Sequence, residues 1–340
     1  MKVSILCETI QATQTISFCF DQSNIPHDTQ INFQLHSWNE LKNSDIKSRY
    51  QSLFDCDYLI LSRWYCPDSA AQLIGSARKY VKKIFLHLDD YLFSVPKSVG
   101  ISKWRYYSSE KMINSLYKTV ELCDGIIAST SRLAHHIEAI LPRANIHICP
   151  YYKNFDFRKC TGDNVTERIY PVIGYMGTQT HADDLDLISS DLDDLMHRNP
   201  LIRFETFGIE VPKVLLEKYS SRCSTLPKVS NYQEFQSVLS SRGWWLGLAP
   251  LVKTQFNYCK ANTKFLEYIQ AGTPVIASHY GPYEDTPITN YNSIDSWLCQ
   301  IEQSLFSKKK RHLLYEKQLQ YCLQFSDPIL LVDFYKSLLN

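Results

Sequence analysis

Short apolar runs alternate with longer amphipathic segments along most of the chain. Consecutive apolar positions are typical of strands that are covered on both faces, and they predict strands at Lys2–Glu8, Thr29–Ser37, Asp57–Arg63, Lys83–Asp90, Gly125–Thr130 and Asn145–Pro150. Helical spacing lies between these runs, at Ser69–Tyr80, Trp104–Leu122 and Arg132–Leu141. Repeated strand–helix alternation predicts a parallel sheet with helices on both faces.

The same alternation restarts after a polar stretch, Tyr151–Arg168, which lacks periodicity and is predicted to be a linker. Strands are expected at Tyr170–Gly177, Arg203–Gly208, Ser224–Pro227, Trp244–Leu251 and Thr273–Ser278. Helices are expected at Leu185–His197, Lys213–Ser220, Tyr232–Ser240 and Lys260–Ala271, and the tail from Ile294 to Asn340 also reads as helices. We therefore predict an α/β protein with two doubly wound, Rossmann-like domains that face a cleft.

Composition narrows the class of protein. The 340 residues suffice for two domains, and the apolar share of 44% with a charged share of 21% is that of a globular protein. A net charge of +1 gives no reason to expect a nucleic-acid partner. The 11 cysteines show no metal-binding spacing, and the chain shows no signal-peptide pattern and no apolar run of the ~20 residues that a membrane span needs. These features predict a cytoplasmic protein with reduced thiols and no metal.

The first candidate for chemistry is a stripe of charged residues, Lys260, Lys264 and Glu267, on a helix expected to begin near Lys260. This helix follows the carboxyl end of the predicted strand Trp244–Leu251. A lysine and the backbone N–H groups at such a helix start can hold a diphosphate, and Glu267 can accept a hydrogen bond from a ribose hydroxyl. The alternative is a solvated face with a Lys264–Glu267 ion pair.

A second candidate is the glycine turn that follows the predicted strand Tyr170–Gly177. Gly177 permits close approach of a ligand to the backbone, while Thr178, Thr180 and His181 supply donors. The alternative is an ordinary strand-to-helix turn in which Thr180 caps the helix.

Two further segments carry polar groups at predicted strand ends. His87, Asp89 and Asp90 are placed either to contact sugar hydroxyls and assist proton transfer, or simply to cap a helix. The Gly-Pro turn at Gly281 offers backbone N–H groups to a ligand, or only reverses the chain.

Five motifs together resemble a known family. They are IGYMGTQTHADDL, LGLAPLVKTQFNYCKANTKFLEY, AGTPVIASHYGPY, HLDDYLFSVP and CDGIIASTSRLAHHI. In these motifs the sequence resembles retaining glycosyltransferases of the GT-B fold, of the family 4-like type found in bacterial glycan assembly. The resemblance implies an acceptor-side domain at residues 1–155, a nucleotide-sugar domain at 168–305, and C-terminal helices at 306–340 that pack back on the first domain.

The implied reaction moves a sugar, with retention and without a metal or other cofactor, from a UDP- or GDP-sugar type of donor to a glycan or lipid-linked saccharide in surface-polysaccharide synthesis. Glu267 matches the family glutamate that binds ribose, and Lys260 would neutralise the diphosphate. The base would lie near Leu226–Val229. His87, Asp89 and Asp90 would line the acceptor side. The remaining donor-binding residues would be Gly177, Thr178, His181, Lys264, Asn262 and Gly281.

The sequence departs from the family in three places. Cys259 stands where the family has its first glutamate, Thr178 and Asp183 or Asp184 replace a basic pair, and CETIQATQTI lacks the glycine-rich loop. A non-catalytic GT-B protein that binds a glycan or a partner is therefore the main alternative; an epimerase or phosphorylase of the same fold is another.

Basic residues give a separate hypothesis about membranes. Ser307–Arg311 (SKKKR), together with Lys79, Lys82 and Lys83, predicts either contact with an anionic membrane surface or merely a solvated helix start.

Overall fold

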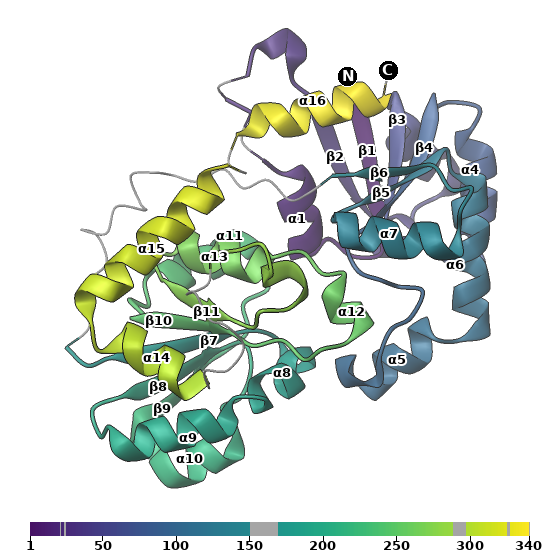
Figure 1. Cartoon of the computed structure of the whole chain (residues 1–340). Helices are drawn as coiled ribbons and strands as arrows, with labels where there is room; N and C mark the ends of the chain where they lie inside the picture. The colour runs from purple at the N-terminus through teal and green to yellow at the C-terminus, as the bar shows by residue number, and fades with distance from the viewer. Residues whose placement is uncertain (21, 24, 150–168, 288–296, 325–326, 340) are drawn as a thin grey trace. The chain divides into compact units, whose positions relative to one another are not determined.

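The computed structural model describes residues 1–20, 22–23, 25–149, 169–287, 297–324 and 327–339 (Figure 1). The predicted linker, Tyr151–Arg168, lies outside the described residues. The chain divides into two compact units. The first contains Met1–Asn154, Cys259–Ala261 and Asp327–Asn340, and the second contains Phe155–Tyr258 and Asn262–Ser326.

The first unit is built on a six-stranded parallel sheet in the order β2-β1-β3-β4-β5-β6. Its strands are β1 Lys2–Cys7, β2 Asn32–Ser37, β3 Tyr58–Ser62, β4 Lys83–Leu88, β5 Gly125–Ala128 and β6 Ile146–Ile148. Each predicted strand is found, with trimmed ends. Strands β1, β3, β4 and β5 are buried almost throughout, which agrees with their consecutive apolar positions.

Helices cover this sheet and connect its strands. They are α1 Ala12–Phe18, α2 Trp38–Leu41, α3 Ile46–Phe54, α4 Ala70–Ala77, α5 Ile101–Tyr107, α6 Glu110–Leu122, α7 Ser131–Ile140 and α16 Pro328–Leu339, with 3₁₀ turns η1 His27–Thr29 and η2 Lys97–Val99. The prediction of one helix over Trp104–Leu122 is wrong. The side chain of Ser109 accepts a hydrogen bond from the N–H of Met112 and so begins α6 as a separate helix.

The C-terminal helix returns to the first unit. Leu331, Val332 and Tyr335 of α16 are buried in the same apolar cluster as Val3 and Ile5 of β1. Figure 1 shows α16, in yellow, lying across the strands of this sheet. The predicted packing of a C-terminal helix on the N-terminal domain is therefore confirmed, and it involves α16.

The second unit holds a five-stranded parallel sheet in the order β11-β10-β7-β8-β9. Its strands are β7 Val172–Met176, β8 Arg203–Phe207, β9 Cys223–Leu226, β10 Leu246–Ala249 and β11 Val275–Ala277. The chain builds outward from β7 in one direction through β8 and β9. It then crosses to the other side of β7 to add β10 and β11. The predicted α/β architecture with two parallel sheets is confirmed.

Two apolar clusters cover the faces of the second sheet. One contains residues of α11, α13 and α15, and the other contains residues of α8, α9, α10 and α14. The helices are α8 Ala182–Asp186, α9 Ser189–Arg198, α10 Lys213–Tyr219, α11 Tyr232–Ser240, α12 Gln255–Tyr258, α13 Thr263–Gln270, α14 Trp297–Leu305 and α15 Lys308–Leu323, with 3₁₀ turns η4 Gln179–His181, η5 Ser220–Arg222 and η6 Gly281–Tyr283.

Three details of the second half differ from expectation. The helix expected over Leu185–His197 is two helices, α8 and α9, and the helix expected from Lys260 begins at Thr263. Helix α15 packs within the second unit, so the segment that returns to the first unit starts at Asp327 rather than at residue 306. Across the described ranges, no helix combines the length and apolarity that crossing a bilayer requires.

Candidate functional site

The second sheet has a topological switch point between β7 and β10. Chain connections leave in opposite directions from these two neighbouring strands, so their carboxyl ends leave a crevice where open α/β sheets bind ligands. The β7 side supplies Gly177, Thr178 and η4. The β10 side supplies the loop Pro250–Thr254 and α12. The switch point is therefore the reference point for locating the predicted donor-binding residues in the structure.

Lys264 reaches the β7 side of this point. Its Nζ donates to the Tyr175 hydroxyl at 3.2 Å and lies 4.4 Å from the centre of the Tyr175 ring. The Tyr175 hydroxyl in turn donates to the backbone carbonyl of His181 at 3.3 Å. Burial, reinforced by Asp184, raises the pKa of Tyr175 well above its usual range, so the phenol stays neutral and keeps its proton for this bond.

His181 is paired with a buried carboxylate. Its Nδ1 lies 2.8 Å from Oδ2 of Asp184, whose exposed fraction is only 4%. The second oxygen, Oδ1, accepts from the backbone N–H of Val252 at 2.9 Å and from Nδ2 of Asn257 at 3.4 Å. Val252 and Asn257 lie on the β10 side, so Asp184 connects both sides of the switch point.

Gly177 serves the packing of two rings. A Cβ on Gly177 would lie 3.3 Å from Cε1 of Tyr175 and 3.4 Å from Cβ of His181. Its own N–H donates to the carbonyl of Phe207 at 3.0 Å. This bond continues the β7–β8 pairing and occupies the Gly177 amide; the predicted close approach of a ligand to the Gly177 backbone stays a prediction.

Thr178 and Thr180 bond to each other, with 2.8 Å between their hydroxyl oxygens. Thr180 does not cap a helix, since the residue before α8 is His181. Gly281 adopts φ +56°, and a Cβ there would lie 3.0 Å from Cα of Tyr258. The glycine thus lets η6 lie close against α12.

Glu267 lies one turn beyond Lys264 on α13. Its Oε1 accepts from the Tyr232 hydroxyl at 2.9 Å, and Gln236 Nε2 donates to the same hydroxyl oxygen at 3.2 Å. Tyr232, at the start of α11, thereby orients the carboxylate. Asn262, just before α13, donates through Nδ2 to the Tyr321 hydroxyl at 3.3 Å.

Lys260 lies elsewhere than expected. Because α13 begins at Thr263, Lys260 does not share a helical stripe with Lys264 and Glu267, and Cys259–Ala261 belong to the first unit. The carbonyl of Cys259 accepts from Oγ1 of Thr130 at 2.9 Å. Burial raises the pKa of the Cys259 thiol to about 12, so this side chain is neutral at the position where the glycosyltransferases that the sequence resembles have a glutamate.

The polar groups of the first unit gather at the carboxyl ends of β3 and β4. Arg63 has φ +51°, a sparsely populated conformation for a residue with a Cβ. Its guanidinium forms ion pairs with Asp89 and Asp90, and Oγ1 of Thr13 donates to Oδ2 of Asp89 at 3.0 Å. The aspartates cap no helix, because the next helical turn, η2, begins at Lys97.

His87 is enclosed in the first unit, with an exposed fraction of 2%. Its Nδ1 lies 3.1 Å from Oγ of Ser62, and the Phe18 ring packs against the imidazole. The Ser62 hydroxyl oxygen accepts a hydrogen bond from Nε2 of Gln14 at 3.0 Å. Burial lowers the pKa of His87 to about 4; nearby Asp89 opposes this shift and Arg63 adds to it. The structure therefore places His87 as a neutral group in the core rather than on a surface.

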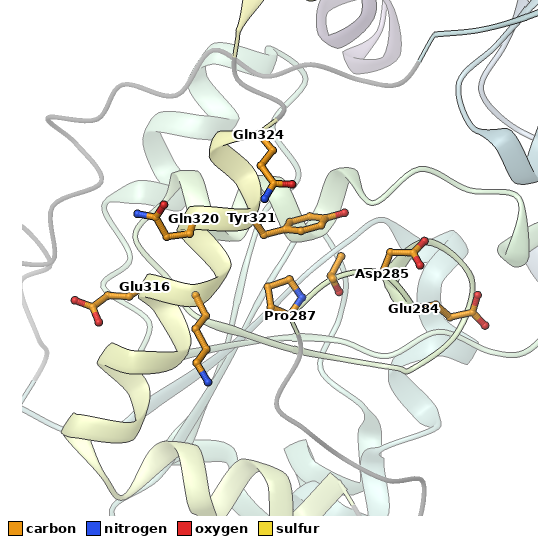
Figure 2. Close-up of a pocket in the computed structure, with 9 residues that line it drawn as sticks. Glu284, Asp285, Pro287, Glu316, Gln320, Tyr321 and Gln324 are labelled. Atoms are coloured by element: carbon orange, nitrogen blue, oxygen red, sulfur yellow. The ribbon is translucent and has the colours of Figure 1, made fainter.

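A pocket of about 590 Å³ lies beside α15 in the second unit (Figure 2). Gln320 and Tyr321 project from α15, and Gln324 directly follows the helix. The rest of the lining is Glu284, Asp285, Thr286, Pro287, Glu316 and Lys317. With three carboxylates and one lysine, this pocket suits a diphosphate poorly, so we do not include it in the donor site.

The basic residues considered for membrane contact differ in their exposure and their partners. Lys308, Lys309 and Lys310 are exposed, but Arg311 is 7% exposed, with its guanidinium carbon 4.2 Å from the centre of the Trp245 ring. Lys82 lies 3.4 Å from Asp57, and Lys83 donates to the carbonyl of Leu338. Among the residues that the structure describes, no group of three or more His, Cys, Asp or Glu side chains is placed to hold a metal ion.

The sequence matches no protein-family model and no curated protein sequence. The structure, however, is similar to solved glycosyltransferases. An α-glucosyltransferase solved with UDP and a 13-mer DNA superimposes with a TM-score of 0.64 at 12% identity, over 100% of this chain and 99% of that one. A UDP-forming α,α-trehalose-phosphate synthase from Burkholderia xenovorans gives 0.60 at 11% identity, over 99% and 98%.

The fold is GT-B. Staphylococcus aureus TarM, solved with UDP, fondaparinux and α-GlcNAc-glycerol, also has it, with a TM-score of 0.60 at 13% identity. The match covers 83% of this chain and 55% of TarM, so the chain spans about half the length of that protein. At these identities the likeness shows the GT-B fold alone.

Proposed function

We propose that the protein is a glycosyltransferase that uses a nucleoside-diphosphate-sugar donor and a saccharide acceptor. One observation carries the proposal: at the switch point of a GT-B fold, the Tyr175 hydroxyl bonds both to Lys264 Nζ and to the backbone carbonyl of His181, and Glu267 lies on the same helix as Lys264. Two nitrogen donors suit a diphosphate, and a carboxylate suits the paired hydroxyls of a ribose. The structural neighbours solved with UDP support this choice of donor.

Transfer builds negative charge on the departing diphosphate as its bond to the sugar breaks. Hydrogen-bond donors of the protein that are held in place before the reaction stabilise that charge without having to reorganise. Lys264 and His181 are proposed for this role, with Lys260 as a further cation to be tested. Glu267 would bind the ribose, and the base would lie near Leu226–Val229, where β9 ends.

The finer features rest on the family resemblance. We propose a retaining, metal-independent reaction with a glycan or lipid-linked saccharide acceptor, in the synthesis of a bacterial surface polysaccharide. The acceptor side would be the carboxyl edge of the first sheet, where Arg63 binds Asp89 and Asp90. We also propose that the enzyme acts in the cytoplasm, with Lys308, Lys309 and Lys310 able to contact the inner face of the membrane.

A non-catalytic role is the second candidate, and Cys259 is the observation that favours it. A buried, protonated thiol does not carry the negative charge that a carboxylate would have at this position. The two functions differ in whether a sugar nucleotide is consumed, whereas both allow binding.

Donor binding is tested by thermal shift with UDP, GDP, CDP and their common sugar conjugates, in the presence of a chelator. We expect one nucleotide class to raise the melting temperature, because a ligand at about a hundred times its Kd stabilises the folded state by about 2.7 kcal/mol. Lys264→Met and Glu267→Gln should lose most of the shift, since charge-assisted bonds contribute about 1.5–3 kcal/mol each.

The matched controls for this test lie on α10. Lys218→Met and Glu217→Gln alter exposed residues and should leave the shift unchanged. If no nucleotide shifts the wild-type protein, the donor proposal fails; an equal shift in Lys264→Met would remove Lys264 from the site.

A further inference from the structure

A buried carboxylate, that of Asp184, forms hydrogen bonds to groups on both sides of the switch point. Asp184 is on α8, yet its partners come from both sides: His181 precedes α8, and Val252 follows β10. These two bonds measure 2.8 Å and 2.9 Å. A carboxylate that is only 4% exposed is costly to bury unless hydrogen bonds and charge compensate it.

The bond to Asp184 fixes the His181 ring. A carboxylate oxygen only accepts, so Nδ1 carries a proton and donates to Oδ2. The same logic operates where a carboxylate sets the tautomer and orientation of a histidine that binds a ligand through its other nitrogen. The Gly177 backbone lies against the ring, because a Cβ there would be 3.6 Å from its Cδ2.

Lys264 is tied to the same loop. Tyr175 accepts from Lys264 Nζ at 3.2 Å and donates to the His181 carbonyl at 3.3 Å. Its buried ring also lies 4.4 Å from that Nζ. A hydrogen-bonded series therefore runs from Lys264 on α13, through Tyr175 on β7, to His181, and then through the ring to Asp184 and the Val252 loop.

We propose that Asp184 and Tyr175 are positioning residues that hold His181 and Lys264 as a pair of donors for the two phosphoryl groups of a nucleoside diphosphate. His181 would donate through Nε2 and Lys264 through Nζ. Asp184 also holds the loop at Val252 against the β7 side, so it sets the width of the crevice. The inference rests on the proposed use of a nucleotide sugar.

The test compares a nucleoside diphosphate with its nucleoside. UDP, GDP and CDP, each beside uridine, guanosine or cytidine, are titrated by calorimetry into the full chain and its variants. Asp184→Asn should weaken diphosphate binding about tenfold or more, while nucleoside binding changes by less than about threefold. Asp186→Asn is the control: it removes the same charge from an exposed position on the same helix.

Tyr175→Phe keeps the buried ring and removes only the hydroxyl, so it serves if Asp184→Asn does not fold. It should give the same selective loss, with Tyr219→Phe on α10 as its control. His181→Gln combined with Asp184→Asn should bind diphosphate about as weakly as either single variant, because the two residues are proposed to act as one unit.

The outcomes separate the two proposals. Absence of diphosphate binding by the wild-type chain would overturn the donor proposal and this inference with it. Tight binding by the wild type that persists in Asp184→Asn and Tyr175→Phe would overturn only the positioning role. Equal loss of nucleoside and diphosphate binding would mean that Asp184 merely maintains the fold.

Discussion

A neutral histidine in the core gives the first unit a pH-dependent stability. The pKa of His87 is lowered from 6.5 to about 4 by burial. The unfolded chain therefore takes up a proton near pH 6.5, whereas the folded chain resists until about pH 4. The contribution of His87 to the stability is fully present above the pKa of the unfolded state, and it is lost as the pH falls from about 6.5 to about 4.

The expected size of this effect follows from the shift. Between pH 7 and pH 4.5 the wild-type chain should lose about 2 kcal/mol of unfolding free energy through His87. His87→Asn, which cannot titrate, should lack this part of the loss. Urea denaturation at the two pH values measures it, and His135→Asn, an exposed position on α7, is the control. An unchanged pH slope in His87→Asn would contradict the assignment.

At the scale of residues, the charged groups of the candidate site can be recognised in the sequence, but the residues that hold them in place cannot. Lys264, His181 and Glu267 follow recognisable motifs, so the sequence alone identifies them as candidates. Tyr175 reads as an ordinary core aromatic, and Asp184 as one of several acids on a solvated helix. Their roles depend on contacts with residues 89 and 68 positions away, respectively, which no local pattern contains.

At the scale of helices and strands, the packing of α16 on the first unit can be tested by substitution. The helix has one buried face that includes Leu331, and Leu330 beside it is 43% exposed. Leu331→Ala should lower the unfolding free energy by about 2–5 kcal/mol, because it empties space in the core. Leu330→Ala makes the same change in side-chain volume at an exposed position, so it should lower the unfolding free energy far less.

Urea unfolding followed by circular dichroism measures both variants of α16. Similar small losses for Leu331→Ala and Leu330→Ala would show that α16 contributes little to the first unit. A large loss for Leu330→Ala alone would contradict the packing face described for this helix.

Elements are predictable where a buried strand or a clear cap marks them. Helix α11 has the bounds that the sequence predicts, since Asn231 caps it and accepts from the N–H of Glu234. Helices α1 and α3 are missed, because their stretches are mostly polar. The predicted start of α13 is three residues early, as Lys260–Asn262 has no feature that excludes a helix.

At the scale of the whole chain, alternation of strands and helices predicts two parallel sheets, because strands buried on both faces appear as continuous apolar runs. The order of strands within each sheet is beyond such a pattern, since crossovers depend on packing between distant segments. The returning helix is predicted, but its starting point at Asp327 is not, because α14, α15 and α16 all show helical patterns.

The most direct test of the central claim is the release of nucleoside diphosphate from a panel of sugar nucleotides, in the presence of a chelator. We expect the wild-type chain to release nucleoside diphosphate from one class of sugar nucleotide. Lys264→Met should lower kcat by about a hundredfold or more, since it removes a cation that stabilises the departing diphosphate, and Lys218→Met should match the wild type. If the wild-type chain consumes no sugar nucleotide, the protein is not a sugar-nucleotide-dependent transferase; equal rates in wild type and Lys264→Met would exclude Lys264 from catalysis.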